Sequence, residues 1–174
     1  MGDVGTRPER FNTRPAKPGD APAITRIYNR GISERVATFE THEKSVDELA
    51  ALIESGALAL VAERAGEIVA FVKVGPYDDA NHYYSGIGEA TLYVDAGARR
   101  SGVGRALMEA VATAAEERGY YKLVGKIFTS NEHSIALVEA CGWRQVGVHR
   151  RHGRLDGEWK DVVVVERLLG DAAG

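Results

Sequence analysis

The chain has 174 residues, of which 44% are hydrophobic and 27% charged, and its formal net charge at pH 7 is -3. This length and composition predict one globular domain and exclude a fibrous or intrinsically disordered protein. The small negative charge provides no overall basic field, and no apolar run approaches the roughly 20 residues that span a membrane, so we expect neither nucleic-acid nor membrane binding.

The N-terminal part is expected to hold a leader, a strand and two helices. Residues 1–10 are polar and glycine-bearing and are interpreted as a flexible leader, which a short edge strand over 11–14 follows. One helix is predicted to start at Asp20, a typical capping residue. Another is predicted to start at Ser45, which forms a capping box with Glu48.

The middle of the chain is expected to be mostly strand. Residues 58–63 and 68–74 are strand-like apolar runs, and Ala65-Gly66 between them predicts a tight hairpin. Residues 77–88 mix polar, tyrosine and glycine residues without a period, which is typical of a surface loop. Residues 89–95 alternate between two faces and predict a further strand.

Apolar residues at helical spacing predict the clearest helix of the chain between Gly102 and Gly119. A strand over 120–128 and a helix over 131–140 are expected next. Cys141 follows and is the only cysteine, so no intrachain disulfide can form. A buried thiol in a reducing, cytoplasmic compartment is therefore expected.

Two strands over 143–154 and 158–168 are expected to pair, because Asp156-Gly157 between them is a strong hairpin signal. The complete order is β-α-α-β-β-β-α-β-α-β-β, which places the chain in the mixed α/β (α+β) class. One domain is expected over 11–170, with 171–174 as a tail.

The turn over 99–106 joins a predicted strand directly to the clearest helix. A helix N-terminus leaves about four backbone N–H groups unpaired and carries the positive end of the helix dipole. Glycines at Gly102 and Gly104 would let a phosphate group approach these N–H groups closely. Cationic donors flank the glycines, at Arg99, Arg100 and Arg105.

Two other phosphate-binding motifs do not fit this turn. A P-loop needs Lys followed by Ser or Thr where Arg105-Ala106 stands, and a dinucleotide fingerprint needs a small residue where Leu107 stands. The alternative to a ligand site is a tight turn whose glycines only satisfy the backbone angles.

The pattern Arg-x-x-Gly-x-Gly between strand and helix, followed by Asn131, Ser134 and Gly142-Trp143, resembles the coenzyme A-binding core of the GNAT superfamily. Over residues 14–169 the chain also resembles the phosphinothricin and arsinothricin N-acetyltransferase group. The segments that carry this second resemblance are Ile27-Tyr28-Asn29, Ala37-Thr38-Phe39-Glu40-Thr41, Gly75-Pro76-Tyr77, Glu89-Ala90-Thr91-Leu92-Tyr93-Val94, His152-Gly153 and Trp159-Lys160-Asp161.

The resemblance implies a single-domain GNAT fold, in which about four helices flank a mixed, mostly antiparallel central sheet of about seven strands. It implies acetyl-coenzyme A (acetyl-CoA) as cofactor and a homodimer as the assembled state. It also implies acetyl transfer to the α-amino group of a small amino-acid-like acceptor of the phosphinothricin, arsinothricin or methionine sulfoximine type, which gives resistance to a toxic compound.

The resemblance also assigns site residues. Cofactor contacts are implied along the strand, the glycine turn and the next two helices, at Leu92, Tyr93, Val94, Arg99, Arg100, Ser101, Gly102, Val103, Gly104, Arg105, Ala106, Asn131 and Ser134. Acceptor contacts are implied at Tyr28, Thr38, Phe39, Tyr77, Glu89 and Trp159. No metal site is expected, because His149 and His152 are predicted to face opposite sides of a strand.

Amine acetylation needs a base, because an alkyl amine titrates near about pH 10 and only roughly one molecule in a thousand is unprotonated at neutral pH. The resemblance places this base at Glu89, acting directly or through water, whereas the alternative is a solvated carboxylate at a strand edge. A backbone N–H near Val94 is implied as the donor that stabilises the oxyanion. Related enzymes carry Tyr or His where Val138 stands, so no side-chain acid is predicted for the leaving thiolate.

The loop after Tyr77 leaves the acceptor open. Related loops carry arginines that suit an anionic acceptor, whereas Asp78 and Asp79 would repel an anion and suit the cationic amine of a peptide or protein. Four arginines elsewhere could compensate, namely Arg30, Arg35, Arg150 and Arg151. The absence of an acid at Val138 keeps a non-catalytic acetyl-CoA sensor as a further alternative.

Overall fold

The structure is a computed structural model that describes residues 11–77 and 82–174. The expected leader over 1–10 and the loop positions Asp78 and Asp79 lie outside the described residues, so these predictions are not tested. Within the part of the chain that the structure describes, no helix is long and apolar enough to cross a membrane.

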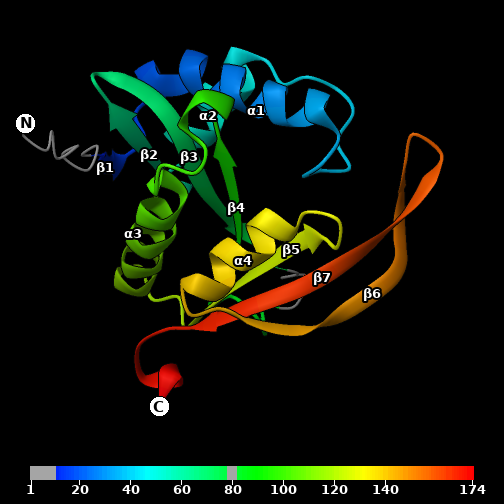
Figure 1. Ribbon diagram of the computed structural model, residues 1–174. Helices are drawn as coiled ribbons and strands as arrows, with labels where there is room; N and C mark the ends of the chain where they lie inside the picture. The colour runs from blue at the N-terminus through cyan, green and yellow to red at the C-terminus, as the bar shows by residue number, and fades with distance from the viewer. Residues whose placement is uncertain (1–10, 78–81) are drawn as a thin grey trace, which may run out of the picture.

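One mixed sheet forms the centre of the fold (Figure 1). In spatial order its strands are β1 (Asn12–Pro15), β2 (Leu58–Arg64), β3 (Glu67–Pro76), β4 (Ile87–Val94), β5 (Lys122–Phe128), β7 (Glu158–Leu168) and β6 (Arg144–Leu155). All neighbouring strands in the described residues are antiparallel except β4 and β5, which are parallel. The predicted mixed, mostly antiparallel sheet of seven strands is confirmed.

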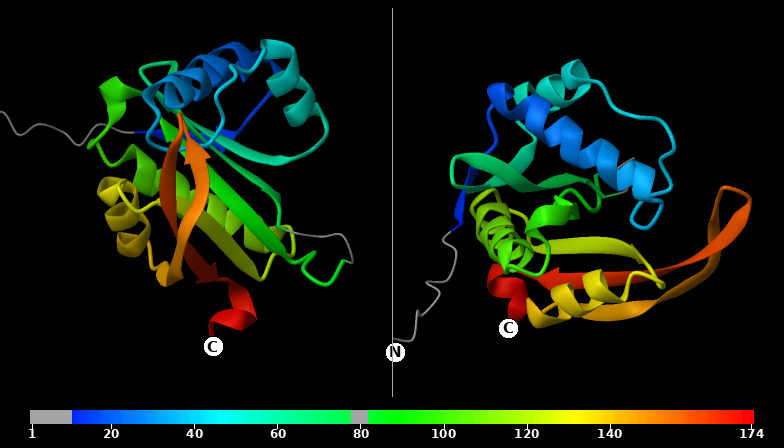
Figure 2. Two further views of the ribbon diagram at one scale, coloured as in Figure 1. Left: turned by 90° about the vertical axis from the view of Figure 1, so that its right-hand side faces the viewer. Right: turned by 45° about the horizontal axis from the view of Figure 1, so that its top comes forward.

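Helices cover both faces of the sheet (Figures 1 and 2). α1 (Ala21–Glu34) and α2 (Val46–Glu54) lie on one face, which we call the α1 face. α3 (Val103–Glu117) and α4 (Glu132–Ala140) lie on the other, the α3 face. Each layer has its own apolar core, so the sheet is buried on both sides.

The alternation predicted for β4 divides its side chains between these cores. Tyr93 packs in the core beneath α1, whereas Ala90, Leu92 and Val94 pack against the core beneath α3. Because side chains alternate along a strand, Glu89 shares the face of Tyr93. The predicted base therefore lies on the α1 face.

Local signals set the ends of several elements as predicted. Ala65 and Gly66 have φ angles of 52° and 82°, and Asp156 and Gly157 have 49° and 84°, which are the left-handed conformations of a two-residue hairpin turn. Ser45 caps α2 in a complete capping box. These short-range signals need no tertiary contact to act, which is why they can be recognised in the sequence.

The β6–β7 hairpin extends beyond the rest of the sheet and curves toward the side of α1 (Figures 1 and 2). Its turn residue Asp156 pairs with Arg35, the C-cap of α1, at 3.2 Å. Phe39 lies against Gly153 of β6, where an added Cβ would come within 2.7 Å of the phenyl ring. The hairpin and the segment between α1 and α2 therefore meet over the α1 face.

A bulge in β6 changes the arrangement of its histidines. The register against β7 shifts between His149 and Gly153, and the backbone N–H of Arg151 donates to Asp161 Oδ1 at 2.7 Å. The prediction that His149 and His152 face opposite sides is wrong, because the bulge interrupts the strand alternation and their rings stack with centroids 4.6 Å apart. Among the described residues no group of three or more His, Cys, Asp or Glu side chains could hold a metal ion.

Candidate active site

The parallel strands β4 and β5 separate in the middle of the sheet. They pair only from Ile87 to Glu89 on β4 and from Lys122 to Val124 on β5. Beyond these three pairs β4 continues to Val94 without a partner on its β5 side in the described residues. Alternate N–H and C=O groups over 90–94 are therefore left for a ligand to bind.

A cleft of about 80 Å³ lies where the two strands diverge. Its walls come from β4, β5, α3 and α4, and they include four residues predicted to contact the cofactor, namely Leu92, Tyr93, Asn131 and Ser134. Asn131 also caps α4, because its side-chain oxygen accepts from Ser134 N at 3.2 Å. Trp143 lines the cleft too, and its buried indole N–H has no hydrogen-bond partner in the described residues.

The glycine turn lies at the N-terminus of α3. Gly102 is the N-cap residue, its φ is 89°, and no side chain caps the first turn of the helix. A Cβ added at Gly102 would meet no atom within 4 Å, so the surface above it is open. The first N–H groups of α3 are thus presented to an anion without obstruction, which fits the pyrophosphate of coenzyme A.

The three arginines of the turn have different surroundings. Arg99 binds Glu34 of α1 at 2.5 Å and donates to the carbonyl of Val94 at 3.3 Å. Arg105 pairs with Glu109 one turn along α3 at 3.1 Å. Arg100 is exposed, with a φ of 62°. Arg99 is therefore held toward α1, whereas Arg100 and Arg105 face solvent beside the open turn.

The other predicted cofactor residues mainly build the turn. Ser101 donates its hydroxyl hydrogen to the carbonyl of Ala98, and Val103 is buried beneath the helix start. A Cβ added at Gly104 would lie 3.0 Å from Leu137, which shows how closely α3 approaches α4 there. Ala106 closes the first helical turn by donating its N–H to the carbonyl of Gly102 at 3.1 Å.

Glu89 lies at the point where β4 and β5 begin to separate. It belongs to an interior strand and not to a sheet edge, and its side chain is 30% exposed. Its Oε2 accepts from Lys126 Nζ of β5 at 2.9 Å, and the same ammonium lies 6.0 Å above the ring of Tyr77. Lys126 was not predicted as a site residue. Strand alternation predicts that Lys126 shares the face of Val124. The pairing register between β4 and β5 brings it beside Glu89, and this register cannot be predicted from the residues around Lys126.

Tyr28 and Tyr93 join α1 to β4 behind this ion pair. Their rings stack with centroids 4.7 Å apart, and Gly31 makes this possible because a Cβ there would lie 2.6 Å from the Tyr93 ring. The Tyr28 hydroxyl donates to Glu40 Oε1 at 3.2 Å. Burial raises the pKa of Tyr28 far above its usual value, so its hydroxyl stays a neutral donor.

The remaining predicted acceptor residues lie around the α1 face. Phe39 packs edge-on against Phe128, with ring centroids 4.7 Å apart, and Thr38 Oγ1 accepts from the N–H of Glu40 at 3.1 Å. Trp159 lies near the tip of the β6–β7 hairpin, half-exposed, with the Arg154 guanidinium 4.3 Å above its ring. The structure thus brings the segment after α1 to the sheet, whereas Trp159 stands on the protruding hairpin.

Comparison with known proteins decides the family. The family model described as "Acetyltransferase (GNAT) family" matches residues 23–143, which include the separated strands and the glycine turn. The chain belongs to the GNAT acetyltransferase family. It is therefore an N-acetyltransferase that uses acetyl-CoA as acyl donor and cofactor.

Relatives cover nearly the whole of this acetyltransferase. A phosphinothricin N-acetyltransferase of Alcaligenes faecalis is 30% identical over 90% of this chain and 81% of its own length. One of Streptomyces viridochromogenes is 31% identical over 89% of this chain and 87% of its own. The crystal structure of a phosphinothricin acetyltransferase from Sinorhizobium meliloti in complex with acetyl-CoA superimposes with a TM-score of 0.85 at 26% identity, covering 93% of this chain and 90% of the other.

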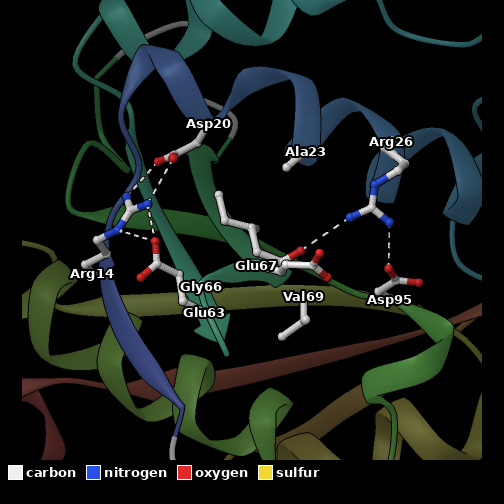
Figure 3. A pocket seen from close by; sticks show the side chains of 10 residues that line it. Arg14, Asp20, Ala23, Arg26, Glu63, Gly66, Glu67, Val69 and Asp95 are labelled. Carbon is white, nitrogen blue, oxygen red and sulfur yellow. Dashed lines mark hydrogen bonds and ion pairs between the residues drawn. The ribbon is translucent and has the colours of Figure 1, made fainter.

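Another cavity, of about 480 Å³, lies away from the cleft between β4 and β5 (Figure 3). Figure 3 shows that its charged side chains point toward one another: Arg14 binds Asp20 and Glu63, and Arg26 binds Asp95. Asp20 occupies the predicted N-cap position of α1, but its carboxylate binds Arg14 and the N–H of Lys17 and caps no N–H of that helix. Because both arginines of the cavity are already bound by carboxylates, we interpret the cavity as part of the scaffold.

The Arg14 guanidinium holds the pKa of both the Asp20 and the Glu63 carboxyl groups below their ordinary values. A carboxyl group with a lowered folded-state pKa stabilises the fold above its unfolded-state pKa, and this stability is lost as the pH falls through the folded-state pKa. We expect Arg14→Met to lower the melting temperature by about 2–4 °C at pH 7. The difference from the wild type should shrink below pH ~4, where the carboxyl groups become protonated. Thermal unfolding across this pH range measures both effects, and a pH-independent difference would contradict the ion-pair explanation.

Proposed function

We propose that this protein transfers the acetyl group of acetyl-CoA to the α-amino group of a small amino-acid-like acceptor. The acceptor is of the phosphinothricin, arsinothricin or methionine sulfoximine type, and acetylation protects the cell from it. The observation that carries the proposal is the position of Glu89, on the α1 face at the point where β4 leaves β5. Glu89 directly precedes Ala90, which lines the cofactor cleft, and its ion-pair partner Lys126 lines the cleft as well.

In this proposal α3 and the backbone of β4 bind the cofactor, and Glu89 activates the acceptor. Acetyl-CoA supplies an activated acyl group as a thioester. The N–H groups at the start of α3 hold the pyrophosphate, and a backbone N–H near Val94 stabilises the negative charge that develops on the thioester oxygen. Glu89 accepts a proton from the acceptor ammonium, which makes the nitrogen a nucleophile. Val138 lines the cleft and offers no proton, so water protonates the leaving thiolate in this proposal.

Thiol release from acetyl-CoA tests the acceptor class. The purified protein is given L-methionine sulfoximine, phosphinothricin and arsinothricin, and in parallel a lysine-containing peptide. We expect release with the amino acids and none above background with the peptide. Release with the peptide alone would replace this proposal by acetylation of a protein amine, the acceptor that Asp78 and Asp79 suit in sequence. No release with any amine would leave an acetyl-CoA sensor.

A homodimer and a cytoplasmic location complete the proposal. β6 is an edge strand of the sheet, and Val146 and Val148 on it are half-exposed, which favours burial against a second copy. Cys141 is buried and is the only cysteine, as expected in a reducing compartment. Light scattering of the purified protein measures the assembled state.

A further inference from the structure

The ion pair between Glu89 and Lys126 raises a problem for any amine that approaches the predicted base. Nζ of Lys126 lies 2.9 Å from Glu89 Oε2, and the two side chains are 43% and 30% exposed, so solvent and small molecules reach both. An acceptor arrives mostly as an ammonium ion, because its pKa lies near about 10. It must therefore displace one cation, the lysine ammonium, with another.

A simple amine gains little from this exchange. Its ammonium would replace Lys126 at Glu89, but the lysine would then lose its anionic partner without compensation. A zwitterion solves the problem, because it carries an anion for Lys126 next to the cation for Glu89. The charges of the site then stay balanced before and after binding.

We propose that the acceptor binds as a zwitterion by inserting into the Glu89–Lys126 ion pair, with its ammonium on Glu89 and its carboxylate on Lys126. This inference rests on the proposed function and deepens it by assigning the residue that recognises the acceptor's carboxylate. Lys126 is a binding residue in this role. It accounts for the recognition of an amino acid by a chain whose loop after Tyr77 carries aspartates at positions 78 and 79.

Lys73 of β3 adds a second positive charge on the same face. It pairs in register with Thr91, two residues beyond Glu89 on β4, so its side chain shares the α1 face. Its ammonium lies 5.5 Å above the Tyr28 ring, and no ion pair joins it to another described residue. The α1 face thus carries Lys73 and Lys126 beside Glu89 and Glu40, and Glu40 already pairs with Lys44 at 3.0 Å. This balance favours an acceptor with an anionic group over a cationic peptide.

Binding of the zwitterion between Glu89 and Lys126 does not change the number of protons that the reaction releases. The acceptor nitrogen loses two protons as its bond to the acetyl carbon forms and the carbon–sulfur bond breaks. One proton passes to Glu89 and then to solvent, and the other reaches the leaving thiolate through water. Lys126 gives up no proton and serves only to hold the carboxylate, which turns the nitrogen toward Glu89.

The test compares L-methionine sulfoximine with the amine that remains when its carboxyl group is removed. For each variant the ratio of the two kcat/KM values is measured, so that the different basicities of the amines cancel. Lys126→Met should lower the ratio of amino acid to amine at least tenfold, mainly through a higher KM for the amino acid. Its kcat/KM for the simple amine should rise, because Glu89 loses the cation that competes with the amine's ammonium group. Lys126→Arg should keep most of the preference, and Lys17→Met, a lysine outside the active site, should keep all of it.

Three results would overturn the inference. If Lys126→Met lowers kcat/KM equally for both acceptors, Lys126 supports the site without recognising the carboxylate. If the wild type uses both acceptors equally well, the proposed acetyl transfer to an amino-acid-like acceptor stands while zwitterion insertion fails. If the wild type uses neither acceptor, the proposed function itself fails, and the inference falls with it.

Discussion

Replacing Glu89 with glutamine is expected to lower kcat by about 10²- to 10⁴-fold at neutral pH, the usual loss when a general base is removed. Glutamine keeps the size of the side chain and can still accept a hydrogen bond from Lys126, so the local packing is preserved. It cannot take a proton from an ammonium ion at this pH. The measurement is steady-state turnover of an amino-acid acceptor, with acetyl-CoA binding followed by calorimetry as a check on the fold.

The pH dependence of Glu89→Gln separates a base from a binding group. As the pH rises toward about 10, a growing share of the acceptor is already unprotonated. The difference in kcat between the wild type and Glu89→Gln should therefore become smaller. Glu67→Gln, at an exposed position at the start of β3, is a matched control and should retain wild-type turnover. A Glu89→Gln enzyme with an unchanged rate near neutrality would remove Glu89 from the mechanism.

The elements of the fold were predictable where short-range signals act. The two hairpin turns, at Ala65-Gly66 and Asp156-Gly157, and the capping box at Ser45 depend on residues within a few positions of one another. The glycine turn before α3 belongs to the same class, because its conformation and its role at a helix start are both local. The order of strands and helices follows from these signals and from apolar periodicity.

The interactions of the site were less predictable, because they depend on register between distant strands. Glu89 and Lys126 are 37 residues apart, and nothing near either residue indicates that they meet. Arg99 was predicted to contact the cofactor, but the pairing that holds it toward Glu34 crosses 65 residues of sequence. The stacked pair His149 and His152 was missed for a different reason, since a bulge changes which face a strand residue occupies.

The second large effect is expected at Gly102, where a negative charge should weaken acetyl-CoA binding. A Cβ at this position would point into open space, so a side chain can be added there without a clash. Its φ of 89° strains any residue with a Cβ, but asparagine and aspartate tolerate such angles better than most. Gly102→Asn and Gly102→Asp therefore share the strain and nearly the same shape, and they differ in one unit of charge.

We expect Gly102→Asp to raise the Kd for acetyl-CoA by about 10- to 100-fold beyond the increase caused by Gly102→Asn, because its carboxylate repels a pyrophosphate held at the start of α3. The difference between the Kd values of the two variants should become smaller at high salt, because the carboxylate is exposed and salt screens its repulsion. Isothermal titration calorimetry at low and high ionic strength measures both effects, and melting temperatures establish that the two variants fold alike. Equal Kd values for the two variants would mean that the phosphates bind away from this turn. The N–H groups of α3 would then lose the role that the strand-turn-helix geometry assigns to them.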